Sequence, residues 1–147
     1  RVHGVQSMIA LPELDRIAEA NLSYSTFISH NRQTNRGEYA ILCGDMPALV
    51  NTEPKMTQAL AAQELSCLPS VLGRAGYHTV YLQAAPIGFM SKDSFMPLAG
   101  FEEVHGEQWF RRSYARNQWG IDDLSFLQQS TAKIAQLQKQ GRQPDRR

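Results

Sequence analysis

The apolar residues of this chain recur at helical spacing in some segments and form strand-like runs in others. Apolar residues three or four positions apart, flanked by residues that start and stop helices, predict helices. These helices cover residues 11–21, 35–44, 66–76, 91–96 and 122–141. Alternating runs rich in β-branched and aromatic residues predict strands, which cover residues 22–28, 78–82 and 101–104. Helices that alternate with strands are typical of the α/β class.

Some predictions concern the ends and faces of individual helices. Asn21 should end the first helix in a left-handed turn. Asn35 and Glu38 have the spacing of a capping box, so the second helix should begin there. Asp122 and Asp123 suit the positive end of the last helix. Its buried stripe should consist of Leu124, Leu127, Thr131, Ile134 and Leu137.

The number of strands bears on how much of a domain the chain contains. The helix at 66–76 leads through Gly76 into the strand at 78–82, which is half of a βαβ crossover. A doubly wound sheet needs more strands than the two or three expected here. The chain also begins with Arg rather than Met. We therefore expect residues 1–147 to be the N-terminal portion of a larger α/β domain, incomplete at both ends.

Composition and charge narrow the classes of function. Fifteen Lys and Arg against fourteen Asp and Glu give a net charge of +1, which argues against a nucleic-acid partner bound through bulk positive charge. No apolar run approaches the ~18 residues of a membrane span. The two cysteines, Cys43 and Cys67, either form one bridge in an oxidising compartment or are small apolar residues near the core.

The segment most indicative of chemistry is residues 33–38, where a polar loop enters a helix. Thr34 would lie beside the first unpaired N–H groups, a favourable place for a phosphate or sulfate ester. A threonine hydroxyl needs a base or a metal ion to become a nucleophile. Arg36 could pair with an anionic oxygen. From these residues alone, ordinary helix capping is the simpler interpretation.

Six blocks of the chain, in order, resemble the sulfatase and alkaline-phosphatase superfamily, and most of all its branch of lipoteichoic acid synthases and phosphoglycerol transferases. Residues 33–43, QTNRGEYAILC, resemble the nucleophile motif, in which Thr precedes xRGEFAxLC. Residues 88–93, GFMSKD, resemble GFMNRD. The remaining blocks are residues 11–18, 24–29, 67–82 and 119–123.

The resemblance implies a fold and a reaction. The fold would be part of a three-layer αβα domain with a mainly parallel sheet. Thr34 matches the family's nucleophile, which also binds a divalent metal, usually manganese. It would attack a phospholipid head group or another anionic ester and pass the phosphoglycerol to a glycan or polyol acceptor, or to water. The catalytic domain would lie outside the cytoplasmic membrane, anchored by helices beyond this chain.

Three further positions match substrate-binding positions of the family. Lys92 stands where Arg is usual, Gln83 where His is usual, and Met90 where some members have Trp and others Met. Glutamine can form hydrogen bonds but cannot shuttle a proton near neutral pH. The alternatives are therefore a degenerate, non-catalytic domain that binds anionic head groups, or an interaction module without an anion site. Structural roles also remain open, with Lys92 solvated and Gln83 closing the strand end.

The other metal ligands are not found in this sequence. The family's first ligand is an acidic residue before the first helix, whereas residues 1–10 contain no Asp or Glu. The family's later Asp-His pair also has no counterpart, because no Asp-His dipeptide occurs. We therefore expect the segment by itself to show no turnover.

Overall fold

The computed structural model describes residues 11–24, 26–28, 33–46 and 66–141. The chain divides into two compact units, Arg1–His30 and Asn31–Arg147, and each is described by itself. No helix among the described residues is both long and apolar enough to cross a membrane.

The first unit contains the predicted helix α1, Pro12–Ala20, with its proline in the first turn. The predicted left-handed turn at Asn21 is wrong, because this residue is extended at φ −136°. Its side-chain amide instead donates to the carbonyl of Ile17 at 2.9 Å. The predicted strand at 22–28 is also wrong for its described residues, which are exposed and belong to no strand. Without a ladder partner, alternation does not make a strand.

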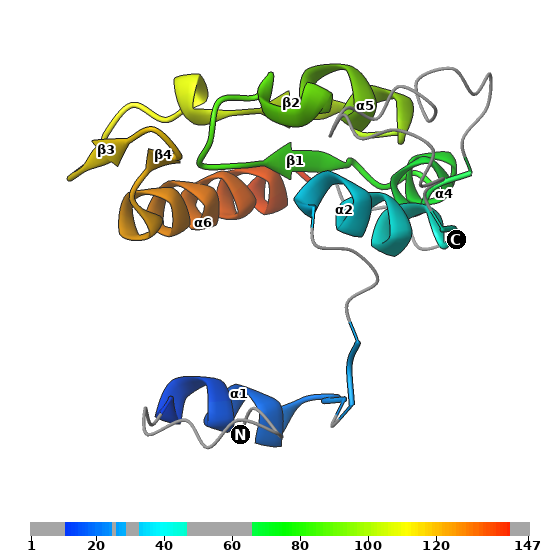
Figure 1. Cartoon of the computed structure of the whole chain (residues 1–147), viewed down its shortest axis with the longest axis horizontal. Helices are drawn as coiled ribbons and strands as arrows, with labels where there is room; N and C mark the ends of the chain where they lie inside the picture. The colour runs from blue at the N-terminus through cyan, green and yellow to red at the C-terminus, as the bar shows by residue number, and fades with distance from the viewer. Residues whose placement is uncertain (1–10, 25, 29–32, 47–65, 142–147) are drawn as a thin grey trace. The chain divides into compact units, whose positions relative to one another are not determined.

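The second unit contains the remaining helices and strands of the described residues (Figure 1). In chain order they are α2 (Thr34–Cys43), α4 (Leu68–Arg74), β1 (Val80–Leu82), η1 (Phe89–Ser91), α5 (Lys92–Leu98), β2 (Glu103–His105), η2 (Glu107–Trp109), β3 (Arg116–Asn117), β4 (Gly120–Ile121) and α6 (Asp123–Lys139).

The strands β1 and β2 are parallel, with Tyr81 opposite Val104, and α5 lies in the crossover between them. This is a βαβ unit, and it follows the predicted one along the chain, because the prediction concerned the helix before β1 and not α5. The short strands β3 and β4 form a separate antiparallel hairpin. Because β1 and β2 run in the same direction, their carboxyl ends meet at one edge of the sheet.

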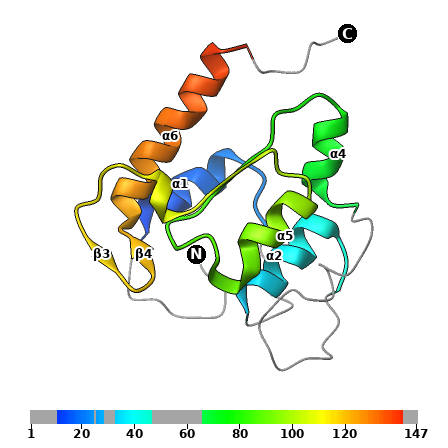
Figure 2. The same cartoon turned by 90° about the horizontal axis from the view of Figure 1, so that it is seen from above.

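The two faces of the β1–β2 sheet meet different surroundings. Tyr81 and Val104 share a face and pack against a buried cluster formed by α5, the residue after it and Cys67, in which Phe95 and Met96 are fully buried. On the opposite face, Glu103 binds Lys133 of α6. Figure 2 shows the strands nearly edge on, with α2 and α5 on one side and most of α6 on the other. This is a layered αβα arrangement.

A disulfide joins Cys43, the last residue of α2, to Cys67, the residue before α4. The choice that the sequence left open is therefore resolved in favour of the bridge. Cys67 is also fully buried in the core cluster. The bridge fixes the end of α2 against the layer that packs on the sheet.

The start of α2 differs from the capping-box prediction, which made Asn35 the N-cap, by two residues. The helix begins at Thr34, its N-cap is Gln33, and no side chain caps it. Asn35 is fully buried in the first turn instead of lying before it. The predicted end is confirmed, because Gly44 is left-handed at φ 65° and its N–H binds the carbonyl of Ala40.

The last helix has its predicted start but not its predicted buried face. The Asp122 carboxylate accepts a hydrogen bond from the Ser125 N–H at 2.9 Å, as expected of an N-cap. The predicted apolar stripe is wrong, because Leu124, Leu127 and Ile134 are more than half exposed. The buried residues of α6 are Ser125 and Ser130, so α6 turns a polar face inward.

Candidate functional site

A buried polar cluster ties β1, α2 and α5 together. Lys92, the first residue of α5, is only 5% exposed. Its ammonium donates to Glu38 of α2 at 3.0 Å and to the Tyr81 hydroxyl at 3.2 Å. A solvated Lys92 is therefore the wrong interpretation, and its charge is balanced by a carboxylate from another helix.

The hydroxyl of Tyr81 is the centre of this cluster. It lies 3.0 Å from Oε1 of Glu38 and 2.9 Å from Oε1 of Gln83. It has a single proton, so it donates to one of these acceptors at a time. Burial raises the pKa of the Tyr81 phenol, and the nearby Glu38 carboxylate raises this pKa further. The hydroxyl therefore stays protonated and acts as a donor at neutral pH.

Gln83 directly follows β1 and is 8% exposed. Its amide nitrogen donates to the carbonyls of Pro86 at 2.8 Å and Ala85 at 3.3 Å. Its amide oxygen accepts from Tyr81. The amide therefore joins Tyr81 of β1 to the loop after β1, and this loop continues into η1.

The strained residues of the cluster are Met90 and Ser91. Both have positive φ, 59° and 58°, a backbone conformation that residues other than glycine rarely adopt. Hydrogen bonds across the turn hold them, among them Ser91 N–H to the Gly88 carbonyl at 3.1 Å. The turn directs the chain into α5 with Lys92 facing inward.

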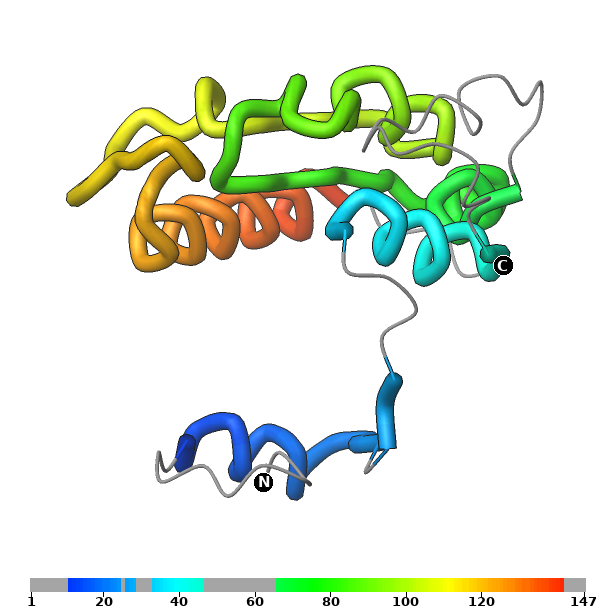
Figure 3. Tube along the Cα trace, in the orientation of Figure 1, coloured from blue at the N-terminus to red at the C-terminus, as the bar shows by residue number. Residues whose placement is uncertain are grey.

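Thr34 is exposed at the first position of α2. Figure 3 shows that α2 begins on the side where β1 ends and runs back along it. Glu38 lies four residues after Thr34 and hence on the same helical face. Arg36 is half-buried in the same turn, and its N–H donates to the Asn35 side chain at 2.9 Å.

The described residues do not form a metal site by themselves. Within them, no group of three or more His, Cys, Asp or Glu side chains could hold a metal ion. The side chain of Thr34, the predicted ligand, has one hydroxyl oxygen. Gln33 directly precedes Thr34, and Glu38 follows it by one helical turn. Oε1 of Gln33 and Oε2 of Glu38 are buried and have no hydrogen-bond partner within the described part of the chain. Hard divalent cations prefer oxygen ligands, but the described residues provide no complete coordination shell.

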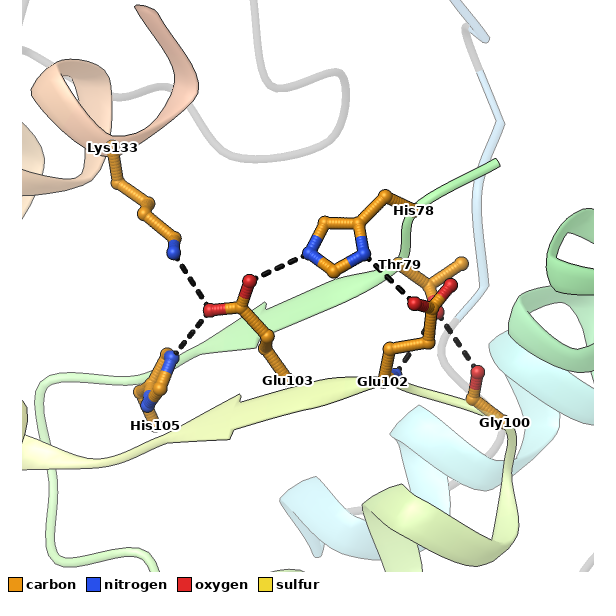
Figure 4. A network of polar contacts seen from close by, with 7 residues as sticks. All are labelled: His78, Thr79, Gly100, Glu102, Glu103, His105 and Lys133. Carbon is orange, nitrogen blue, oxygen red and sulfur yellow. Dashed lines mark hydrogen bonds and ion pairs between the residues drawn. The ribbon is translucent and has the colours of Figure 1, made fainter. Parts of the chain in front are cut away.

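A second polar cluster lies on the other face of the sheet (Figure 4). The Glu103 carboxylate accepts from Lys133 at 2.7 Å and contacts His78 at 2.6 Å and His105 at 2.9 Å. The other ring nitrogen of His78 contacts Glu102 at 2.9 Å. The Lys133 hydrogen bond, helped by those of the histidines, lowers the pKa of Glu103 to about 2. This cluster fastens α6 to the sheet.

The sequence and the fold of this chain resemble those of known proteins. The family model described as "Sulfatase" matches residues 5–145. The chain belongs to the sulfatase family. Among curated sulfatase relatives, phosphoglycerol transferase I of Escherichia coli and that of Shigella boydii are each 26% identical to it over 88% of this chain. The chain spans 18% of the length of these relatives.

Solved structures confirm the fold class of this sulfatase-family chain. A protein of the alkaline phosphatase superfamily from Vibrio parahaemolyticus matches 87% of the chain with a TM-score of 0.77 and 19% identity, over 31% of its own length. A lipoteichoic acid synthase from Listeria monocytogenes matches 77% with a TM-score of 0.66 and 17% identity, over 27% of its own length. The predicted superfamily and α/β fold are thus confirmed.

The structure brings together some of the predicted site residues. Lys92 and Gln83 both form hydrogen bonds with the Tyr81 hydroxyl. Met90 lies in the left-handed turn that precedes Lys92. Sequence reasoning missed Tyr81 and used Glu38 only as a helix cap. The period of two along β1 is a signal for Tyr81, because it places this residue on the same face as Gln83.

Proposed function

We propose that this sulfatase-family domain transfers or hydrolyses a phosphate ester, or a sulfate ester, through Thr34 as the nucleophile. A reaction of the phosphoglycerol transferase type is the proposed one. The observation that carries the proposal is the position of Thr34. Its side chain is exposed at the first residue of a ten-residue helix, in the motif that matches the family's nucleophile. The curated relatives named as phosphoglycerol transferases support a phosphoester substrate.

In the proposed reaction the Thr34 oxygen attacks phosphorus, and the P–O bond to the lipid alcohol breaks. The hydroxyl proton of Thr34 leaves to a base, and the departing alkoxide takes up a proton. The threonine ester is then attacked by an acceptor hydroxyl of a glycan or polyol, or by water, which restores Thr34. The N–H groups of the first turn of α2 face the negative charge of the ester.

Arg36, Lys92, Gln83 and Met90 are the proposed substrate-binding residues. Lys92 retains a means of binding an anion, because an ammonium has three protons and two of them have acceptors in the described residues. Arg36, in the first turn of α2, can bind a second oxygen of the anionic ester. Gln83 and Met90 act through the loop that holds Lys92 in place.

A divalent cation, which we propose to be manganese, belongs to this reaction. When bound, such a cation stabilises the alkoxide form of the nucleophile and the charge on the ester oxygens. Thr34 would supply one ligand, and the others would come from outside the described residues.

The Cys43–Cys67 bridge supports a location outside the cytoplasm, because disulfides persist mainly in oxidising compartments. We propose that the domain is extracytoplasmic and attached to the cell membrane, where a phospholipid head group is the donor. An acceptor glycan or polyol would be reached in the same compartment.

The test is Thr34→Ala in the complete protein with fluorescent phosphatidylglycerol and manganese. Turnover should fall at least about 100-fold, as in other enzymes that lose a nucleophile, and the covalent adduct on residue 34 should vanish from the mass spectrum. Thr131→Ala, at an exposed site of α6, is the matched control and should retain activity. Undiminished turnover by Thr34→Ala would refute the proposal.

The same experiment decides the non-catalytic alternative. Its supporting observation is that the amide of Gln83 is fully engaged within the chain. A complete protein that binds head groups without forming an adduct, and whose binding is unaffected by Thr34→Ala, would favour that alternative.

A further inference from the structure

The loop and hairpin between η2 and α6 form an unusual exposed surface. All nine residues from Arg111 to Trp119 are exposed. Between Phe110 and Ile121 there are three arginines and no acidic residue. The side chains of Tyr114 and Trp119 are 77% and 63% exposed. Figures 1 and 2 show the β3–β4 hairpin projecting at one end of the second unit.

This exposed segment is held in place at several points. The Asp122 carboxylate accepts from the N–H groups of Tyr114 at 2.9 Å and Ala115 at 3.1 Å. The Gln129 side chain accepts from Arg111 N–H at 3.0 Å and donates to the Arg112 carbonyl at 2.8 Å. A segment that is already ordered loses little conformational entropy when it binds a partner.

Trp119 connects the hairpin to the candidate site. Its ring packs edge-on against Phe89, with centroids 6.0 Å apart, and Phe89 begins the turn that leads to Lys92. Nearby, Ile121 N–H binds the carbonyl of Ala84 at 3.1 Å, the residue after Gln83. The exposed aromatic pair is therefore next to the loop that carries the proposed substrate-binding residues.

The partner that fits this chemistry is an anionic lipid surface. Trp and Tyr rings have an apolar body and a polar edge and favour the interface of a bilayer. Arginines near such a surface are attracted by anionic head groups. A nucleic acid is a poorer fit, because the net charge of the chain is only +1. Arg116 is partly neutralised by Glu107 at 3.7 Å, so Arg111 and Arg112 provide most of the free charge.

We propose that the hairpin surface, defined as Phe89, Arg111, Arg112, Tyr114, Arg116 and Trp119, docks on the anionic surface of a phospholipid bilayer. Trp119 and Phe89 enter the head-group layer, and the arginines pair with lipid phosphates. Docking itself does not need Thr34 chemistry. Docking would also bring head groups to the neighbouring site, and this part of the proposal rests on the proposed function.

The test uses the fluorescence of Trp119 in the full 147-residue chain. In Trp109→Phe, Trp119 is the remaining tryptophan. Vesicles with 30% phosphatidylglycerol, roughly the charge of an anionic leaflet, should shift its emission to the blue, and brominated lipids should quench it. Trp119→Phe, which keeps Trp109 stacked on His105, should show neither change. Absence of both changes in Trp109→Phe and in the unmodified chain would overturn the proposal.

The charge requirement has a matched control. Arg111→Gln with Arg112→Gln should weaken binding to the anionic vesicles about tenfold or more. Arg74→Gln with Lys139→Gln removes two exposed charges elsewhere and should change binding much less. Equal effects of the two pairs, equal binding to pure phosphatidylcholine, or the same emission shift with soluble polyphosphate would contradict lipid docking through this surface. Circular dichroism establishes that each variant is folded.

Failure of this proposal can be told apart from failure of the proposed function. Thr34→Ala should bind vesicles as well as the unmodified chain does. If the complete protein turns over phosphatidylglycerol but the hairpin variants bind vesicles normally, the docking proposal alone falls. If vesicles bind through the hairpin and Thr34→Ala retains turnover, docking stands and the nucleophile assignment falls.

Discussion

The ammonium of Lys92 lies 3.0 Å from Oε1 of Glu38, and their side chains are 6% and 24% exposed. This ion pair joins the first residue of α5 to α2, the helix that carries Thr34. A buried pair of this kind contributes little compared with two apolar residues, but breaking it leaves a charge without its partner.

Replacing Lys92 alone should therefore lower the free energy of unfolding more than replacing Lys92 and Glu38 together. We expect Lys92→Met to lower the free energy of unfolding by about 2–3 kcal/mol. In Glu38→Gln with Lys92→Met, part of this loss should be recovered, because no buried charge remains. Urea unfolding of the single and double variants measures the coupling. Lys139→Met, at an exposed site, is the control, and additive losses in the double variant would contradict the prediction.

The Cys43–Cys67 bridge should contribute strongly to stability. It closes a loop of 24 residues, for which the chain-entropy relation gives about 3 kcal/mol. We expect Cys43→Ser with Cys67→Ser to lower the free energy of unfolding by about this amount in urea titrations. Reduction of the unmodified chain by dithiothreitol should produce a similar loss. Unchanged unfolding midpoints in both experiments would show that the bridge contributes nothing.

Glu103 should make stability depend on pH in the acidic range. Its pKa is lowered from 4.5 to about 2 in the folded chain, so its contribution is fully present above pH 4.5 and is lost as pH falls towards 2. The contribution is at most about 3 kcal/mol. The difference in unfolding free energy between the unmodified chain and Glu103→Gln should therefore shrink as pH falls from 5 to about 2.5.

Lys133→Met is the companion variant for that measurement. It removes the largest cause of the lowered pKa and should reduce the pH-dependent part of the stability without abolishing it. A difference between Glu103→Gln and the unmodified chain that stays constant with pH would contradict the assignment.

Substitution by alanine should change the free energy of unfolding in opposite directions at two glycines. Gly120 has φ +114°, and a Cβ there would collide with the Ala84 carbonyl. Gly120→Ala should cost about 3 kcal/mol or more, since strain and overpacking add. Gly37, within α2, has open space around it, so Gly37→Ala should gain about 0.5–1 kcal/mol. Thermal unfolding of both variants checks the signs, and a loss at Gly37 equal to that at Gly120 would refute the argument.

Local patterns were sufficient to predict much of the fold. Helix-starting and helix-ending residues located α1, α4 and α6 to within a few residues, and β-branched residues located β1. The resemblance of the six blocks identified the superfamily that the family match and the solved structures confirm. The prediction of αβα layers came from the resemblance to that superfamily, because the few predicted strands were not enough to indicate it.

What the sequence did not predict depends on contacts between distant segments. Leu124 and Leu127 have the spacing of a buried stripe, but α6 meets the sheet through Lys133 and Glu103, so the leucines are exposed. Spacing could not decide whether Cys43 and Cys67 are joined. The roles of Thr34, Arg36 and the metal stay predictions, and Thr34→Ala tests the first of them.

The left-handed turn at Met90 and Ser91 has a consequence for how the site would come apart. Each such residue costs on the order of 1–2 kcal/mol relative to a right-handed conformation, so the turn persists because its surroundings hold it there. Loss of the anchor at Glu38 would let the backbone relax and carry the lysine outward in the same event. Damage to α2 would then spread directly to the turn before α5, so the two segments should lose their ordered arrangement together.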